Sequence, residues 1–290
     1  MQHPLAAKLT KLLGEPVTRL APTSGGDIND AFLVTLANGR TLFAKTNTDA
    51  LPQMYVREAE GLAWLAEARA LRLPRVIAAT DADADGPACL VLEQIETQTR
   101  GGVAFDEALG RGLAALHLHA APCFGLERPN YLATLAQDNS ACASWPELYA
   151  ERRLAPLAAS AERRGLMPRS LMRRLDQLYH DLPALTGEPE PPARLHGDLW
   201  SGNVLAAISG EPVLIDPAVY GGHREIDLAM MRLFGGFSAR VFAAYDEVHP
   251  LAAGHDDRVA LYQLYPLLAH VNLFGSSYVA QLDRALSRYV

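Results

Sequence analysis

The periodicity of the sequence changes near residue 95, and this change limits the folds that the chain can adopt. Before that point, apolar residues occur in short runs bounded by turn residues, a pattern typical of strands. After it, apolar residues recur mostly at spacings of three and four, a pattern typical of helices. We therefore expect a small strand-rich domain over residues 1–95, followed by a larger, mainly helical domain over residues 96–290.

Within the first domain, the dipeptide Asn38-Gly39 separates two strand-like runs over residues 31–36 and 40–45. This dipeptide favours a two-residue hairpin turn in which both central residues have positive φ. The next segment, residues 55–71, has apolar residues at helical spacing, and two further apolar strands follow over 75–80 and 88–95. The first domain should therefore be an antiparallel sheet with one main helix inserted after the hairpin.

Composition excludes several classes of protein. With 290 residues, of which 49% are hydrophobic, the chain can bury a substantial core without disulfides. The net charge of -7 lacks the positive footprint that nucleic-acid binding requires, so no nucleic-acid partner is expected. The three cysteines form no C-x-x-C motif, which favours a reducing cytoplasm, and no apolar stretch is long enough to cross a membrane.

The densest cluster of polar residues lies in the segment HGDLWSGN, residues 196–203, with VLIDP following at 213–217. Asp198 begins a loop, Asn203 follows five positions later, and Asp216 ends a short apolar strand. Phosphoryl transfer from ATP needs this set of groups. Asp198 would accept or orient the proton of the attacking hydroxyl, while Asn203 and Asp216 would supply hard oxygen ligands to Mg²⁺. Either residue alone could simply cap a turn, but the complete spacing favours a kinase.

Two upstream features fit the same chemistry. Lys45 lies inside the apolar strand TLFAKT, where a lysine needs a partner, and Glu58 on the following helix is a candidate. Such an ion pair positions ATP phosphates in protein kinases. Glycines in SGGDIND, residues 24–30, would let the backbone approach phosphates closely, so Gly25, Gly26 and Asn29 are predicted to bind ATP. Each of these signals is weak by itself.

A calcium site at the turn DADADG, residues 81–86, is not supported. Asp81, Asp83 and Asp85 match the first half of an EF-hand loop, but Leu92 stands where the bidentate glutamate belongs. Strands rather than helices are expected on both sides. We therefore predict a solvated turn between strands.

The chain resembles the fructosamine kinase (ketosamine-3-kinase) family over nearly its whole length, from about residue 9 to residue 289. The resemblance rests on the segments HGDLWSGN, IDPAVYGGHREIDLAM, TLFAKT, EAEGLAWL and GGDIND. That family belongs to the aminoglycoside-phosphotransferase-like branch of the protein kinase fold. The resemblance thus implies an α+β, bilobal protein-kinase-like fold, with a small antiparallel β lobe that carries one key helix and a larger, mainly α lobe.

The resemblance also implies roles for individual residues. Asp198 would be the proton acceptor, Asn203 and Asp216 the metal ligands, and Lys45 the phosphate contact paired with Glu58. The backbone of Glu93, Gln94 and Ile95 would form the hinge that binds adenine, and Asp227 would tie the catalytic loop to the next helix. Asp27 would point away from the phosphates. Positions near the acceptor are matched more weakly by Gln137, Asn139, Trp145, Arg153 and Trp200.

The expected function is ATP-dependent phosphorylation of the 3-hydroxyl of a ketosamine, a sugar joined to an amine, either free or on a glycated protein. Both the sugar-amine and the 3-position come from the resemblance. A kinase of the same branch that acts on an aminoglycoside, choline or another sugar is the enzymatic alternative. A nucleotide-binding pseudokinase scaffold is a further alternative, although it would not need Asp198, Asn203 and Asp216 together.

Overall fold

The computed structural model of the protein describes residues 4–23 and 29–290, and the predicted phosphate-contacting residues Gly25 and Gly26, together with Asp27, lie outside this range. Contacts divide the chain into two units. The first comprises residues 1–100 and 205–216, and the second comprises residues 101–204 and 217–290. The sequence pattern predicts one boundary, between residues 95 and 96. The contacts instead assign a later segment, residues 205–216, to the first unit.

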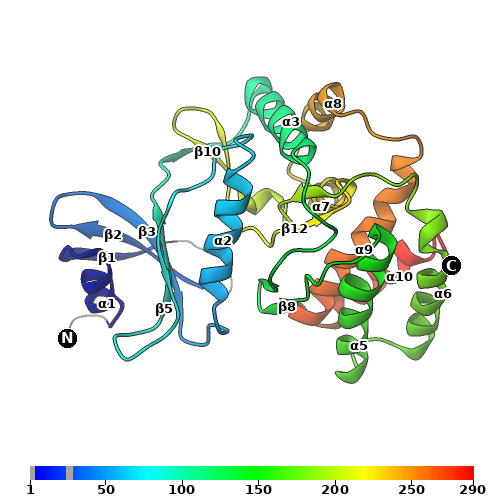
Figure 1. Ribbon diagram of the computed structural model, residues 1–290, viewed down its shortest axis with the longest axis horizontal. Helices are drawn as coiled ribbons and strands as arrows, with labels where there is room; N and C mark the ends of the chain where they lie inside the picture. Colours follow the sequence, from blue (N-terminus) through cyan, green and yellow to red (C-terminus); the bar gives the residue numbers. More distant parts are fainter. Residues whose placement is uncertain (1–3, 24–28) are drawn as a thin grey trace. The chain divides into compact units, whose positions relative to one another are not determined.

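The first unit is built on a five-stranded antiparallel sheet with the strand order β1-β2-β3-β5-β4 (Figure 1). Two helices of this unit precede and interrupt the strands, α1 (Pro4–Leu13) and α2 (Met54–Ala66). The strands are β1 (Val17–Thr23), β2 (Asp30–Leu36), β3 (Thr41–Asn47), β4 (Val76–Thr80) and β5 (Ala88–Glu93). The expected hairpin, the following helix and the two later strands are all present.

The turn of the hairpin differs from the expected two-residue form. Among the described residues from 37 to 39, only Gly39 has a positive φ, of 83°, so Asn38 does not adopt the left-handed conformation. Instead, the Asn38 side chain accepts a hydrogen bond from the Arg40 amide at 2.8 Å, and the Glu15 carboxylate accepts bonds from the Asn38 amide and side chain. The loop therefore comprises residues 37–39, because the Leu36 amide donates to the Arg40 carbonyl at 2.9 Å and the Gly39 amide donates to the Leu36 carbonyl at 3.0 Å.

Alternation along the strands gives the sheet two apolar faces. Side chains such as Val34, Ala44 and Val91 pack with Leu5 and Leu9 of α1. Alternate positions, including Leu90 and Leu92, pack with Leu62 of α2. Because side chains alternate between faces, Lys45, which pairs with Leu90, lies on the face that α2 covers.

A three-stranded sheet with the order β11-β10-β6 completes the first unit. Its strands are β6 (Thr97–Gln98), β10 (Val204–Ala207) and β11 (Pro212–Leu214). The Leu214 amide also donates to the Arg72 carbonyl at 3.0 Å, and the Arg72 guanidinium pairs with Glu211 at 2.6 Å. These contacts bind residues 205–216, and with them Asp216, to the first unit.

The second unit is mainly helical (Figure 1). Its core is a cluster of buried residues that includes Leu175, Leu261 and Leu268. Its helices are α3 (Val103–Leu118), α4 (Trp145–Leu148), the π-helix η1 (Tyr149–Leu154), α5 (Ala155–Arg163), α6 (Arg169–Leu185), the 3₁₀ turn η2 (Ser201–Asn203), α7 (Glu225–Phe234), α8 (Ala239–Val248), α9 (His255–Phe274), the 3₁₀ turn η3 (Ser276–Tyr278) and α10 (Val279–Leu286). Two short antiparallel strand pairs lie among them, the hairpin of β7 (Asn130–Leu132) with β8 (Leu135–Gln137), and β9 (Ala193–Leu195) with the distant β12 (Tyr220–Gly222).

Two helical segments of this unit are interrupted where the sequence pattern predicts a continuous helix. The pattern predicts one helix over residues 257–286, but α9 ends at Phe274 because Gly275 has a φ of 90°. The pattern over residues 145–164 is continuous in helical character but contains the π turn η1. Across residues 4–23 and 29–290, no helix combines the length and the apolar character needed to span a bilayer.

Candidate active site

Lys45 is the buried centre of the first unit's polar cluster. Its side chain is 3% exposed, and its Nζ lies 2.7 Å from Glu58 Oε1 and 2.8 Å from Asp216 Oδ1. The strand pleat directs Lys45 toward α2, which carries Glu58, and the return of residues 205–216 brings Asp216 to the same ammonium group. The structure therefore joins three residues that the sequence places far apart.

The charges in this cluster perturb one another. Burial alone would lower the pKa of Lys45, but the Asp216 and Glu58 carboxylates outweigh it and raise that pKa above its ordinary value. Burial raises the pKa of the Glu58 carboxyl to about 7, although the lysine opposes this shift. Lys45 therefore stays cationic, and the Glu58 carboxyl holds a proton more readily than an ordinary glutamate.

Asp216 is held in an unusual backbone conformation. It follows β11 and has a φ of 54°, in the left-handed region that non-glycine residues avoid at a cost of roughly 1–2 kcal/mol. Aspartate tolerates this region better than most residues. The side chain remains 35% exposed, so one carboxylate can bond Lys45 and still meet a ligand. An outlier of this kind is consistent with a functional position.

In the second unit, Asp198 and Asn203 lie in the loop between β9 and β10. The Asn203 side-chain Nδ2 donates to the Asp198 carbonyl at 2.7 Å and to Asp198 Oδ2 at 3.0 Å. The Asp198 amide approaches His196 Nδ1 at 3.3 Å. Because Nδ2 faces Asp198, the planar amide of Asn203 turns Oδ1 in another direction. The loop thus orients a carboxylate and an amide oxygen.

Asp227, at the start of α7, fixes the base of this loop. Its Oδ2 accepts a hydrogen bond from the His196 amide at 2.7 Å, and its Oδ1 accepts one from the Gly197 amide at 3.0 Å. The same carboxylate lies 3.3 Å from His117 Nε2, and His117 Nδ1 bonds the Tyr245 hydroxyl at 2.8 Å. This is the connection between loop and helix that the resemblance implied for Asp227.

The other residues predicted to bind ATP lie in the first unit. Asn29 Oδ1 accepts a hydrogen bond from the Tyr55 hydroxyl at 2.9 Å, which ties residue 29 to α2. Glu93 ends β5, and its amide donates to the Arg75 carbonyl at 2.9 Å. Gln94 and Ile95 follow in the connection between β5 and β6. Their adenine-binding role stays a prediction.

The five residues predicted near the acceptor divide into two groups. Trp200 is 41% exposed, and its ring lies so close to Gly202 that a Cβ there would come within 2.2 Å of it. The other four, Gln137, Asn139, Trp145 and Arg153, are at most 4% exposed. Their acceptor-binding role stays a prediction. Asn130 and Tyr265, which bond Gln137, are absent from the sequence prediction because single polar residues without a motif give no signal.

Two further features of the structure involve none of the predicted site residues. Lys8 of α1 donates to the carbonyls of Asp81 and Gly86 and pairs with Asp83 at 3.2 Å, so a buried lysine binds the backbone of the predicted turn.

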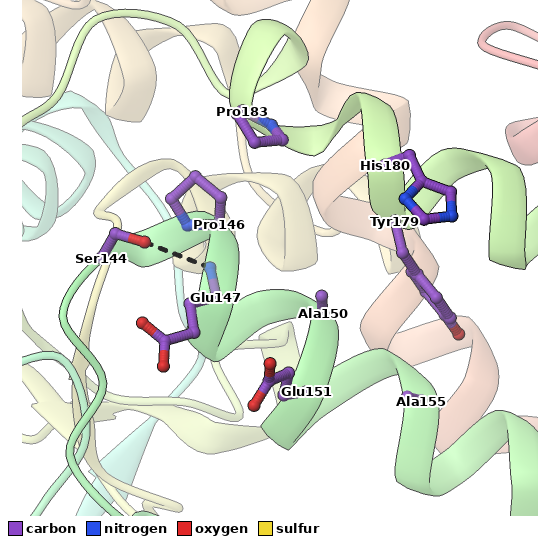
Figure 2. Close-up of a pocket in the computed structure, with 9 residues that line it drawn as sticks. All are labelled: Ser144, Pro146, Glu147, Ala150, Glu151, Ala155, Tyr179, His180 and Pro183. Carbon is purple, nitrogen blue, oxygen red and sulfur yellow. Dashed lines mark hydrogen bonds between the residues drawn. The ribbon is translucent and has the colours of Figure 1, made fainter.

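A pocket of about 350 Å³ lies between the segment containing α4 and η1 and the helix α6 (Figure 2). It is lined by Ser144, Pro146, Glu147, Ala150, Glu151, Ala155, Tyr179, His180 and Pro183.

Comparison with solved structures defines the class of protein. A structure from Thermobifida fusca, provisionally assigned as a fructosamine-3-kinase, has a TM-score of 0.88 and 39% identity, and the match covers 98% of this chain and 97% of that one. An aminoglycoside phosphotransferase structure has a TM-score of 0.63 at 18% identity, which shows a shared fold alone. The fold is therefore that of the protein-kinase-like phosphotransferases, with an antiparallel sheet in one unit and helices in the other.

Sequence comparison then gives the family. The fructosamine kinase family model matches residues 1–290, so the chain belongs to the fructosamine kinase family. A probable ketoamine kinase of Synechocystis is 36% identical, and the match covers 98% of this chain and 95% of the relative. The chloroplastic protein-ribulosamine 3-kinase of Arabidopsis thaliana is 34% identical, with 97% of this chain and 86% of the relative covered.

Proposed function

We propose that this enzyme transfers the γ-phosphoryl group of ATP to the 3-hydroxyl of a ketosamine. The observation that carries the proposal is a complete set of phosphotransfer groups, Lys45, Glu58, Asp198, Asn203 and Asp216, in a chain that matches the family from end to end. The ketoamine kinase and ribulosamine 3-kinase relatives support the sugar-amine acceptor. The three free cysteines of this chain are consistent with a reducing cytoplasm.

Asp198 acts on the acceptor hydroxyl. As the hydroxyl oxygen bonds to the γ-phosphorus, the bond from that phosphorus to the β–γ bridging oxygen breaks and ADP departs. The hydroxyl proton passes to the Asp198 carboxylate. Asn203 Nδ2 holds this residue by donating one hydrogen bond to its Oδ2 and one to its backbone carbonyl. Carboxylates are ionised at neutral pH unless their environment opposes it, so an aspartate can accept this proton.

Lys45 and the two oxygen-donor side chains, the latter through Mg²⁺, offset the negative charge of the phosphates. Lys45 contributes a fixed positive charge, oriented by Glu58. Asp216 and Asn203 each suit Mg²⁺ as a ligand, because a carboxylate and an amide oxygen are hard donors and the Nδ2 of Asn203 is already engaged elsewhere. A bound Mg²⁺ would neutralise charge that develops on the phosphate oxygens.

Trp200 is the residue best placed by its exposure to meet the sugar-amine. Gly202 leaves room for its ring within the catalytic loop, and the ring is 41% exposed. An aromatic face attracts a protonated amine by about 0.5–2 kcal/mol. The net charge of -7 is compatible with such a cationic acceptor.

An ATP-consumption screen tests the proposal. The purified protein is offered ribulosamines and fructosamines of lysine derivatives, free sugars, aminoglycosides and choline, with Asp198→Ala as the blank. We expect the ketosamines to be the preferred acceptors and phosphorus NMR to place the phosphate on C3. Turnover of an aminoglycoside without ketosamine product would leave the fold and overturn the acceptor. ATP binding without transfer to any acceptor would favour a scaffold.

A further inference from the structure

A buried polar network lies directly behind the catalytic loop in the second unit. Asn130 and Gln137 face each other across the pair β7–β8, and Gln137 Nε2 donates to Asn130 Oδ1 at 2.7 Å. The same Nε2 lies 3.2 Å from the Ala218 carbonyl, and Asn130 Nδ2 donates to the Val219 carbonyl at 2.8 Å. Two side-chain amides thus hold two consecutive carbonyls of the chain.

Tyr265 of α9 sets the orientation of the Gln137 amide. Its hydroxyl donates to Gln137 Oε1 at 2.6 Å, which leaves Nε2 to face the Ala218 carbonyl. Burial and the Asp198 carboxylate raise the pKa of Tyr265 to about 12, against the opposing charge of Arg153. The phenol therefore remains a hydrogen-bond donor at every pH at which the enzyme would work.

Arg153 supports the network from the other side. The π turn η1 places two arginines in succession, of which Arg152 has a side chain 32% exposed while Arg153 is fully buried. Arg153 Nη2 donates to Asn139 Oδ1 at 2.6 Å, and Asn139 Nδ2 donates to Asn130 Oδ1 at 2.9 Å. Turns of π-helix occur often at functional sites.

The carbonyl that Gln137 holds is in contact with the residues before Asp198. The Ala218 amide donates to the His196 carbonyl at 2.9 Å. Gly197 has a φ of 83°, and a Cβ added there would lie 2.0 Å from the Ala218 oxygen. Ala218 therefore packs against both residues that precede Asp198, and a shift of its carbonyl must move the loop.

We propose that Gln137, oriented by Tyr265, is a positioning residue for Asp198. It fixes the Ala218 carbonyl against His196 and Gly197, and thereby sets the direction from which the Asp198 carboxylate meets the acceptor hydroxyl. The inference rests on the proposed function, but it assigns Gln137 to the loop rather than to the acceptor. A displacement of about 1 Å at a reacting group can cost on the order of 100-fold in rate.

The test removes a single oxygen atom. Tyr265→Phe deletes the donor and keeps the ring, and Tyr179→Phe is the matched control, because the buried Tyr179 hydroxyl has no hydrogen-bond partner among the described residues. Single-turnover transfer is measured by rapid quench at saturating ATP and ketosamine. We expect Tyr265→Phe to slow transfer by about 10- to 100-fold, with acceptor KM and ATP Kd within about twofold, and Tyr179→Phe to match the parent.

Hydrogen exchange supplies a readout that needs no acceptor. The Ala218 amide should exchange faster in Tyr265→Phe than in the parent, whereas Tyr179→Phe should leave it unchanged. If Tyr265→Phe folds poorly, Gln137→Met replaces it, because this variant lacks the donor to Ala218. It should show the same slower transfer and faster exchange. Parental transfer and exchange rates in both network variants would overturn the inference, as would a loss confined to acceptor KM. An inactive parent would overturn the proposed function, while exchange would still show whether Tyr265 and Gln137 hold Ala218 in place.

Discussion

Lys45 and Asp216 are joined by a hydrogen bond of 2.8 Å between Nζ and Oδ1, although 171 positions separate them in the chain. The lysine therefore has a carboxylate partner on α2 and a second one at the end of β11. A substitution of either carboxylate leaves the buried ammonium with the other, so their effects can be separated by experiment.

Asp216→Ala should raise the magnesium concentration needed for half-maximal rate by at least about tenfold and lower the maximal rate, because a charged ligand is lost. Rates are measured across a magnesium titration at fixed ATP. Asp256→Ala is the control, because it removes a carboxylate whose side chain is 76% exposed and pairs with Arg232. Superimposable curves for Asp216→Ala and the parent would remove Asp216 from the metal site.

Asp198→Ala should lower kcat by about 10²- to 10⁴-fold, the usual contribution of a general base. ATP affinity should stay within a few-fold of the parent, because Asp198 is assigned to the acceptor hydroxyl. Steady-state rates measure the fall in kcat, and isothermal titration with a non-hydrolysable ATP analogue measures the ATP affinity. Substantial turnover by this variant would exclude Asp198 as the base.

Glu58→Gln should alter how stability depends on pH. The Glu58 pKa is raised from 4.5 to about 7, so between these values the folded protein holds a proton that the unfolded chain has released. The free energy of unfolding therefore falls as pH rises from the unfolded to the folded pKa of Glu58, and the stability that the retained proton gives is fully present only at low pH. The raised pKa of Lys45 lies above 10.5 and adds no slope there.

In Glu58→Gln, the free energy of unfolding should thus depend less on pH than in the parent between about pH 5 and about pH 8. Its free energy of unfolding relative to the parent should improve toward pH 8 by on the order of 1 kcal/mol. Urea titrations at several pH values measure this. A parallel profile for the variant and the parent would mean that Glu58 keeps an ordinary pKa.

Asp227→Asn should destabilise the protein by about 1–3 kcal/mol, because one oxygen that accepts a buried amide is replaced by a donor. Activity should fall as well, since the loop that carries Asp198 loses its anchor. Chemical denaturation measures the first effect and steady-state rates the second. Asp246→Asn, which alters a carboxylate bonded to the Leu251 amide at the surface, should change the free energy of unfolding far less.

Local rules are sufficient to predict part of the site. Strand alternation and helical spacing predict that Lys45 and Glu58 meet, because one pleat and one helix face decide it. The spacing of Asp198 and Asn203 likewise lies within a single short loop. These contacts depend on residues close in sequence, where periodicity and turn chemistry carry the information.

Other contacts depend on tertiary packing that no local pattern encodes. Arg152 and Arg153 are chemically identical neighbours, yet the π turn buries the second and leaves the first at the surface. Asn130 and Tyr265 lie on different elements and meet Gln137 only after folding. The predicted two-residue form of the hairpin turn is wrong, and the Asn38 amide donates instead to Glu15, 23 positions away, a contact that no local pattern shows.

The return of residues 205–216 to the first unit has a consequence for biosynthesis. A ribosome that has released residues 1–100 has not yet made β10, β11 or Asp216, so β6 lacks its strand partner and Lys45 has only Glu58. Chains often fold domain by domain as they emerge. Here the nascent amino-terminal unit must wait for more than half of the other unit to be translated before its lysine acquires both carboxylates.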